Sequence, residues 1–276
     1  MLSMFNILVK LLMFINAYLE VRSNFLADNK TRIIGGEECD DADYSFMVSL
    51  REEEDNHSCG GTLISSLWVL SAAHCHNFMK FALIGTWSRK EYREFVLVKV
   101  AKVKIHPEYS SSTLENDIAL ALLEEPIKNS SFVKIPDKML YGDLIRYCSM
   151  ALVMGWGVTN YLSDESPTKL NCVYLRVIPI SKCEAKYQHP FSFKQTCAYM
   201  HGKDSCRGDS GGPLICGDVQ YGIVSWGRKC AEDYPGVYIR IDQYLNFIQK
   251  TMRGCGLSIS FSYTVLFYLL SFTKFF

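Results

Sequence analysis

The sequence lacks an excess of charge of either sign, because 29 Lys and Arg residues balance 29 Asp and Glu residues. A protein that binds nucleic acid needs surplus positive charge against the phosphates, so nucleic acid is not expected as a partner. The chain also lacks internal repeats and low-complexity linkers. Its 276 residues therefore fit one folded domain of roughly 200–250 residues, with a short segment at each end.

The cysteines lack the short paired spacings of a zinc site, although there are eleven of them. Cytosolic thiols stay reduced, so this number of cysteines indicates an oxidising, extracellular compartment. Acceptor sequons for N-linked glycans begin at Asn29, Asn56 and Asn129, which points to the same compartment. The run His74-Cys75-His76 has metal-binding residue types, but no second cluster completes a site. We therefore expect neither a metal nor a cofactor.

The amino-terminal segment lacks a basic start and an obvious Ala-x-Ala cleavage site. Residues 5–19 are nonetheless mostly apolar, and their run is shorter than a membrane span but suits the core of a signal peptide. We expect a signal peptide over residues 1–22 and a pro-segment over residues 23–32. An uncleaved membrane anchor is the alternative.

The carboxy-terminal residues 255–276 lack acidic side chains and are rich in Leu, Phe, Tyr, Ile and Val. Three interpretations stay open. The small residues 254–256, a spacer and an apolar end match a glycolipid-anchor signal. The length of the segment also matches a membrane span, although its six Ser or Thr residues make a span less apolar than usual. The third interpretation is that the segment is the tail of a released protein. We expect a secreted or surface-anchored protein whose folded domain covers residues 33–254.

Between these segments, short β-rich runs alternate with turns, and few windows are helical. The expected strands are 46–50, 61–64, 68–71, 95–105, 118–122, 150–156, 174–178, 213–215, 221–225 and 236–241. This density of short strands is typical of an all-β barrel or sandwich. One helix is expected over residues 242–253, with Asp242 as its cap and Gly254 at its end.

The stretch 204–213, Asp-Ser-Cys-Arg-Gly-Asp-Ser-Gly-Gly-Pro, concentrates three chemical tasks. Ser210 precedes two glycines and a proline, so a tight turn can expose its hydroxyl. The backbone amides of Gly208 and Ser210 can converge on one point and stabilise an oxyanion. A hydroxyl is a weak nucleophile without a base and an orienting acid. The sequence offers both in Ser-Ala-Ala-His74-Cys and Glu-Asn-Asp117-Ile-Ala-Leu.

These motifs, in the order His, Asp, Ser, resemble the trypsin-like members of the chymotrypsin family of serine proteases. The resemblance covers residues 33 to about 253 and implies two packed antiparallel β-barrels with a boundary near Asp143. It also implies the family's mechanism, in which His74 takes the proton of Ser210 and Asp117 holds the imidazole. We therefore expect a serine endopeptidase with Gly208 and Ser210 as the oxyanion hole.

The same resemblance implies a primary specificity pocket. Asp204 falls at its base beside Ser205, and two glycines on its walls leave a deep slot for a long cationic side chain. The other positions that the resemblance assigns to substrate binding are Ser225, Trp226, Gly227 and Gly236. Cleavage of protein or peptide substrates is expected after Arg or Lys.

Two departures from the family pattern concern charge. Arg207, Arg228 and Lys229 put three cations at the pocket mouth, which we expect to favour acidic residues beside the cut. The loop after Gly85 lacks the acidic set that binds calcium in trypsins, so no calcium site is expected. His57 lies in an acidic loop inside a sequon and receives no role from the sequence.

A basic residue before Ile-Ile-Gly-Gly resembles the activation site of the family's zymogens. A cut after Arg32 frees the ammonium of Ile33, and the resemblance assigns Asp209 as its buried partner. A trypsin-like activating protease is therefore an expected partner. A membrane is a second possible partner, through the apolar carboxy-terminal tail.

The resemblance also pairs ten of the cysteines, a connectivity that spacing alone does not give. The implied pairs are Cys39 with Cys172, Cys59 with Cys75, Cys148 with Cys216, Cys183 with Cys197, and Cys206 with Cys230. Cys255 is left over.

Two other functions stay open. A catalytically silent relative acting as a binding module would have lost Ser210, His74 or Asp117, yet all three are present. A protease of different specificity would carry a neutral residue in place of Asp204 or bulky pocket walls.

Overall fold

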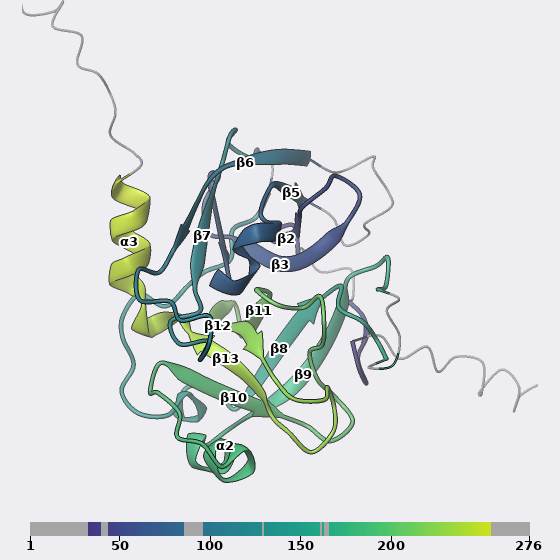
Figure 1. The fold of residues 1–276 in the computed structure, drawn as a ribbon, viewed down its shortest axis with the longest axis vertical. Coiled ribbons are helices and arrows are strands. Elements are labelled where there is room, and N and C mark those ends of the chain that lie inside the picture. Colours follow the sequence, from purple (N-terminus) through teal and green to yellow (C-terminus); the bar gives the residue numbers. More distant parts are fainter. Residues whose placement is uncertain are drawn as a thin grey trace, which may run out of the picture.

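The computed structural model describes residues 33–39, 44–85, 96–128, 130–160, 162 and 166–254. The expected signal peptide, the expected pro-segment with Arg32, the sequons at Asn29 and Asn129, most of the loop after Gly85 and the tail with Cys255 lie outside the described residues. Figure 1 shows that the described part forms two stacked β-barrels, with α3 (Leu245–Gly254) along one side and α2 (Ile180–Tyr187) at the far end. The expected fold, two packed antiparallel β-barrels with a carboxy-terminal helix, is confirmed.

The first barrel is closed, in the order β2-β3-β4-β7-β6-β5, and each neighbouring pair is antiparallel. Its strands are β2 (Met47–Arg51), β3 (His57–Leu63), β4 (Trp68–Ser71), β5 (Phe81–Ile84), β6 (Val96–Ile105) and β7 (Ala119–Leu123). β4 is buried along its whole length, which explains its apolar sequence Trp-Val-Leu-Ser. This strand leads directly to the histidine motif.

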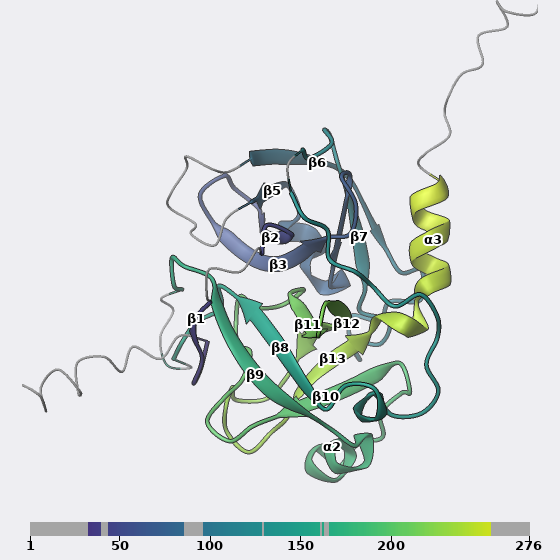
Figure 2. The same ribbon diagram turned by 180° about the vertical axis from the view of Figure 1, so that it is seen from behind.

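The second barrel joins β8 (Met150–Gly155), β9 (Asn171–Ile178), β10 (Gln195–Tyr199), β13 (Gly236–Arg240), β12 (Val219–Trp226) and β11 (Pro213–Cys216). These strands hydrogen-bond in that order, and pairing of β8 with both β9 and β11 closes the barrel. The short strand β1 (Glu37–Glu38) adds to the outer edge of β9, as seen from behind in Figure 2. Both barrels lack an open edge over these strands, which removes a site of strand-to-strand aggregation.

Apolar side chains from both halves of the chain meet where the barrels pack. Ile223 of β12, Ile239 of β13 and Ile241 belong to the same buried cluster as the interior of the first barrel. Burial of such aliphatic side chains contributes roughly 1.5–3 kcal/mol each, so the two barrels stabilise each other. Asp143, the expected boundary, lies in the connection between β7 and β8.

Three strands, β1, β5 and β10, and one α-helix were not predicted from the sequence. β5 is only four residues long, and β10 is buried on both faces, so neither has the alternating pattern of a half-buried strand. Helix α2 (Ile180–Tyr187) follows Pro179 and ends where Gln188 adopts a left-handed conformation with φ of 53°. A disulfide from Cys183 to Cys197 ties this short helix to β10.

The carboxy-terminal helix begins later than expected. Helix α3 spans Leu245–Gly254, and a 3₁₀ turn over Ile241–Gln243 precedes it. The carboxylate of Asp242 is not its cap, because it is buried in an ion pair with Arg240 (Nη2 to Oδ2, 2.9 Å). A buried guanidinium is costly without a carboxylate partner, so the side chain of Asp242 pairs with Arg240 and does not cap the helix.

All five implied disulfides are present. Cys59–Cys75 connects β3 to the 3₁₀ helix that carries His74, and Cys206–Cys230 connects two loops beside the pocket. Cross-links of this kind stabilise the fold chiefly by restricting the unfolded chain.

Candidate active site

His74 and Asp117 lie together in the first barrel. His74 is the second residue of a 3₁₀ helix (Ala73–Phe78) that follows β4, and Asp117 lies just before β7. The imidazole Nδ1 of His74 is 2.7 Å from Oδ2 of Asp117, and the His74 amide donates to Oδ1 at 2.8 Å. Because the carboxylate only accepts, the ring carries its proton on Nδ1 and presents Nε2 outward.

A third donor reaches the same carboxylate from the second barrel. The hydroxyl of Ser225 donates to Oδ2 of Asp117 at 2.6 Å, and Asp117 is fully buried. Three donors therefore compensate a carboxylate that burial would otherwise destabilise. The sequence assigned Ser225 only to substrate binding, because nothing local links residues that are 108 positions apart.

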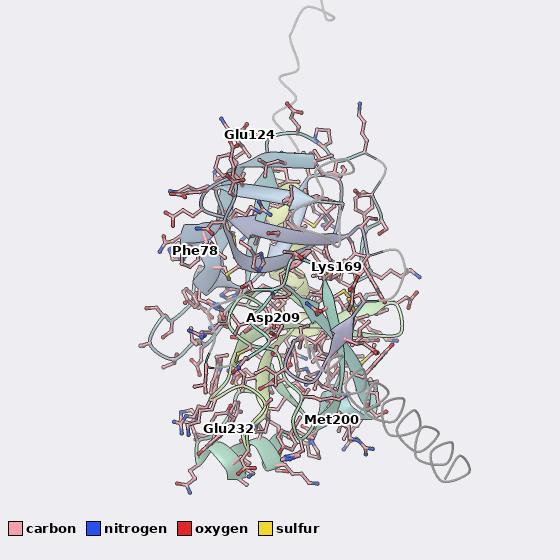
Figure 3. The ribbon with its side chains drawn as sticks, turned by 90° about the vertical axis from the view of Figure 1, so that its right-hand side faces the viewer. Phe78, Glu124, Lys169, Met200, Asp209 and Glu232 are labelled. Atoms are coloured by element: carbon pink, nitrogen blue, oxygen red, sulfur yellow. A yellow bond between two sulfur atoms is a disulfide. The ribbon has the colours of Figure 1, made fainter. Side chains whose placement is uncertain are left out.

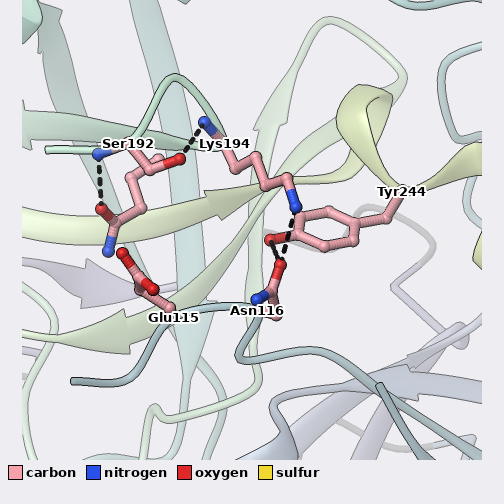
Figure 4. Close-up of a pocket in the computed structure, with 6 residues that line it drawn as sticks. Glu115, Asn116, Ser192, Lys194 and Tyr244 are labelled. Atoms are coloured by element: carbon pink, nitrogen blue, oxygen red, sulfur yellow. Dashed lines mark hydrogen bonds between the residues drawn. The ribbon is translucent and has the colours of Figure 1, made fainter. Parts of the chain in front are cut away.

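Asn116 fixes the loop that carries Asp117 (Figure 4). Its side-chain oxygen accepts from Nζ of Lys194 at 2.9 Å and from the hydroxyl of Tyr244 at 3.1 Å. Its backbone is left-handed, with φ of 53°, a region that asparagine tolerates better than most residues. No role was predicted for Asn116, although its position just before a catalytic candidate was the available signal.

Ser210 reaches the same place from the second barrel. Its carbonyl accepts the amide of Gly60 at 2.7 Å and lies 3.7 Å from Sγ of Cys75, the neighbour of His74. Its hydroxyl makes no hydrogen bond to His74 within the described structure. Such bonds are often long in a free enzyme and tighten when substrate binds.

The turn around Ser210 requires glycine. Gly211 has φ of +80°, and a Cβ there would lie 2.4 Å from the carbonyl oxygen of Gly60. Within the described residues, no internal hydrogen bond uses the amide of Gly208 or of Ser210. Two unpaired amides beside one hydroxyl are the arrangement that an oxyanion site needs.

Asp209 is buried where the two barrels meet, near the centre of the molecule in Figure 3. Its carboxylate accepts the amides of Gly157 and Cys206, each at 2.8 Å. Burial raises its pKa to about 7, although both hydrogen bonds act in the opposite direction. Ile33 is also fully buried, in the core of the second barrel. A cation beside Asp209 would restore its charged form.

A cavity of about 150 Å³ opens beside Ser210. All the residues expected to bind substrate line it: Asp204, Ser205, Ser225, Trp226, Gly227 and Gly236. A Cβ on Gly236 would lie 3.0 Å from Oδ1 of Asp204, so a side chain there would close the slot. Glycine at this wall keeps the carboxylate accessible.

The base of this cavity holds an incompletely paired carboxylate. Oδ2 of Asp204 accepts the amide of Ala231 at 3.1 Å, while Oδ1 is buried without a hydrogen-bond partner. Burial raises the pKa of Asp204 to about 7, against the hydrogen bonds from the amides of Ala231 and Ser205. A buried acceptor of this kind is costly unless a ligand supplies a donor.

Comparison with known proteins agrees with this geometry. The Trypsin family model matches residues 33–248. The chain is 39% identical over 236 residues to Trypsin V-B of Rattus norvegicus, covering 82% of this chain and 92% of that protein. It is 36% identical over 243 residues to Trypsin of Sus scrofa, covering 83% and 100%, and 37% identical over 233 residues to Trypsin-3 of Salmo salar, covering 82% and 95%.

The chain belongs to the trypsin family. It is a serine endopeptidase, and the expected family is confirmed.

As a member of the trypsin family, the chain is expected to bind the amidinium ion benzamidine in the Asp204 cavity. Because the pKa of Asp204 is raised to about 7 in the empty cavity, a proton competes with the ligand below that pH. Affinity should fall roughly tenfold for each pH unit below 7 and stay constant above it. Calorimetry between pH 5 and 8 measures this, on the wild type and on the His74→Ala variant. Constant affinity over that range would contradict the raised pKa.

Two of the three cations expected at the pocket mouth have partners of their own. The guanidinium of Arg228 lies over the rings of Tyr187 and Tyr234, with centroid distances of 5.7 and 5.6 Å. Nζ of Lys229 lies 3.5 Å from a carboxylate oxygen of Glu232. An exposed pair of this kind is weak, but it reduces the local field. Of the three cations, Arg207 lines the cavity.

His57 lies next to the site, although no role was predicted for it. Its Nε2 is 2.8 Å from the carbonyl oxygen of Gly208, and its Nδ1 is 2.8 Å from Oγ of Ser49. Asn56, whose sequon contains it, is exposed in the turn before β3. The contact to Gly208 joins residues 151 positions apart, so no local pattern reveals it.

The histidine–cysteine run does not offer a metal site. Within the described residues, the group with suitable ligand spacing is Cys59, His74 and Cys75, and its two sulfur atoms form a disulfide. A disulfide sulfur is not the thiolate that binds a metal. None of the helices in the described part of the chain has the length and apolar character of a membrane span.

Proposed function

We propose that this chain is a secreted endopeptidase that cuts after Arg or Lys, with Ser210, His74 and Asp117 as its catalytic residues. One observation carries this proposal. The cavity beside Ser210 ends at a buried carboxylate oxygen of Asp204 that has no hydrogen-bond partner. A long cationic side chain supplies the missing donors and charge. A neutral side chain would leave the carboxylate buried and unpaired.

In the proposed reaction, Nε2 of His74 removes the hydroxyl proton as Oγ of Ser210 attacks the scissile carbonyl. Asp117 keeps the other ring nitrogen protonated and stabilises the imidazolium, because it already accepts from Nδ1 at 2.7 Å. The protonated ring then gives its proton to the leaving amine. Water repeats the sequence on the acyl-enzyme, with His74 again as the base.

The developing oxyanion is proposed to bind the amides of Gly208 and Ser210. The neighbouring carbonyls are already occupied: Arg207 accepts from Val158 at 2.8 Å, and Asp209 accepts from Gly212 at 2.9 Å. Because the C=O and N–H of a trans peptide point in opposite directions, both amides are directed away from those partners. Preorganised donors of this kind are worth about 10²–10³ in kcat each.

A fluorophosphonate probe on the activated protein tests the nucleophile. Mass spectrometry should find the probe on Ser210, and the Ser210→Ala variant should take up none. A peptide library on the same preparation tests specificity and also reports any effect of Arg228 on neighbouring positions. No labelling of folded, activated protein would favour the silent binding module, and labelling without an Arg or Lys preference would favour a different specificity.

We also propose that the protein is made as a zymogen. Arg32 precedes Ile33, and Asp209 lies buried with a pKa of about 7, its carboxylate bonded to the amides of Gly157 and Cys206. The ammonium released at Ile33 would supply a cationic partner for this carboxylate. Residues 1–22 are the proposed signal peptide, residues 23–32 the pro-segment, and residues 33–254 the protease domain.

The Arg32→Gln variant should therefore remain inactive after treatment with trypsin. Without a buried ammonium the Asp209 loop loses an ion pair of about 3–5 kcal/mol, so activity should be about 10²-fold or more below the activated wild type. A chromogenic arginine substrate measures this. Lys30→Gln, two residues earlier in the chain, is the matched control and should activate normally. Full activity of Arg32→Gln would remove the zymogen proposal.

For localisation, we propose that residues 255–276 are a glycolipid-anchor signal with transfer at Gly254. The support is the small-residue triplet 254–256 followed by an apolar end without acidic residues. Transfer at Gly254 would remove Cys255, the cysteine that the family's disulfide pattern leaves over, together with the tail. Asn29, Asn56 and Asn129 are the proposed glycosylation sites, in keeping with passage through the secretory pathway.

Treatment of animal cells that express the full chain with phosphatidylinositol-specific phospholipase should release the protease into the medium. A lipid-linked protein leaves the membrane when its diacylglycerol is cut, whereas a spanning segment holds it. An immunoblot of medium and cells measures release. Retention until detergent is added would support a span, and protein in the medium before treatment would support a released form.

A further inference from the structure

A groove of about 410 Å³ lies beside the second barrel and is separate from the cavity that ends at Asp204. It runs between the start of α2, the segment before β10 and the connection that leads to β8. The apolar side chains that line it include Met139, Tyr141, Ile180, Phe191 and Phe193. Three of them are open to solvent, because Tyr141 is 78% exposed, Phe193 68% and Met139 49%. Large apolar side chains around a surface hollow mark a place where another molecule binds.

The polar side chains of this groove are already paired. The guanidinium of Arg240 donates to the carbonyl oxygen of Leu140 at 3.2 Å and to the carboxylate of Asp242 at 2.9 Å. The side-chain amide of Gln243 donates to the same carboxylate at 2.6 Å. The carboxylate of Asp143 accepts the first backbone amide of α2 at 3.4 Å. Because these charges and amides have internal partners, the groove offers a bound molecule mainly apolar surface.

Two stacked aromatic rings join the groove to the proposed active site. The ring of Phe191, which lines the groove, lies on the ring of Trp226, with centroids 5.6 Å apart and planes 7° apart. Trp226 in turn lines the cavity beside Ser210. The ring of Tyr187 contacts both, at centroid distances of 5.6 Å from Phe191 and 4.9 Å from Trp226. The surface from the cavity to the groove is therefore apolar and held in place by packing.

We propose that the groove binds apolar side chains of the substrate, about five to seven residues before the cut. This inference rests on the proposed cleavage after Arg or Lys at Ser210. The residue before the cut fills the Asp204 cavity. His74 gives its proton to the leaving amine, so the residues after the cut lie on the side of His74. The residues before the cut can then follow Trp226 and Phe191. An extended chain advances about 3.3 Å per residue, so several residues are needed to pass the two rings.

Two long peptides test this inference on the activated full chain. Both are cut after the same arginine. One carries Leu and Phe from the fifth to the seventh position before the cut, and the other carries Ser there. The apolar peptide should have a kcat/KM about tenfold higher, mainly through a lower KM, because burial of its side chains outweighs the cost of ordering the chain. Chromatography of the products measures both rates.

A double variant tests whether the groove causes this preference. Tyr141→Ser with Phe193→Ser removes its two most exposed rings and should reduce the difference between the peptides to about twofold or less. Exposed side chains tolerate such changes, so the variant should fold. Tyr174→Ser is the matched control, because Tyr174 is a 56% exposed tyrosine on β9 that does not line the groove. It should keep the difference of about tenfold.

Equal kcat/KM for the two peptides in the wild type would overturn the inference. A dimer in sedimentation that the double variant lacks would then assign the groove to a second copy of the chain. A preference for the apolar peptide that survives in the double variant would also overturn it, since the upstream residues would bind elsewhere. Each of these results leaves cleavage after arginine and labelling of Ser210 in place. Absence of both in the wild type would instead overturn the proposed function.

Discussion

Replacement of Ser210 by alanine is expected to lower kcat of the activated enzyme about 10⁵–10⁶-fold, with KM little changed. Nothing else at the site offers a nucleophile in the same position, and the base His74 cannot act without it. The amides of Gly208 and Ser210 and the Asp204 cavity remain in the variant. If Ser210→Ala still hydrolyses the substrate faster than water alone does, the difference measures the contribution of substrate binding and oxyanion stabilisation.

The measurement is hydrolysis of a chromogenic arginine peptide by activated, active-site-titrated protein. Ser205→Ala is the matched control, since Ser205 lies in the same stretch but its hydroxyl is 3.3 Å from that of Tyr238. That control should keep most of the activity, with only a shift between Arg and Lys. If Ser210→Ala retained more than about one hundredth of kcat, the nucleophile would be another residue.

Replacement of Asp204 by serine is expected to lower kcat/KM on arginine substrates about 10²–10⁴-fold. The substrate guanidinium would enter a buried cavity without its carboxylate, and an unpaired buried charge costs about 3–5 kcal/mol. Hydrolysis of substrates with apolar side chains should rise slightly, because the cavity loses its charge.

The stability of the Asp204→Ser variant should not fall with its activity. The pKa of Asp204 is raised to about 7, so the folded state binds a proton that the unfolded chain has already released above about pH 4. This carboxyl therefore destabilises the fold increasingly as pH rises toward 7, and Asp204→Ser should not melt at a lower temperature at pH 8. Loss of activity with an unchanged or higher Tm would separate specificity from misfolding.

Kinetics on a matched set of arginine, lysine and leucine substrates measures the effect of Asp204→Ser. Asp233→Ser is the control, because Asp233 is an exposed acid near the same loop and should change kcat/KM less than twofold. A surviving arginine preference in Asp204→Ser would show that the cavity base is not the specificity determinant.

His74, Asp117 and Ser210 were identifiable as candidates from sequence, because each lies in a short local motif. Most strands were also predictable, since turn residues and apolar runs are local signals. β5 and β10 were missed because a strand that is very short, or buried on both faces, does not alternate. The disulfide pairs followed from family resemblance, since eleven cysteines do not specify a connectivity.

The amino-acid sequence by itself determined the all-β class, the order of the motifs and the residue types at the site. Only the tertiary structure decided the hydrogen-bond partners of the buried polar groups. Ser225 bonds to Asp117, Arg240 bonds to Asp242, and His57 bonds to the carbonyl of Gly208. The physical reason is that a buried polar group must be paired, and the partner comes from whichever segment the fold brings beside it. For Asp117 and Gly208 that segment lies 108 and 151 residues away, beyond the reach of any local pattern.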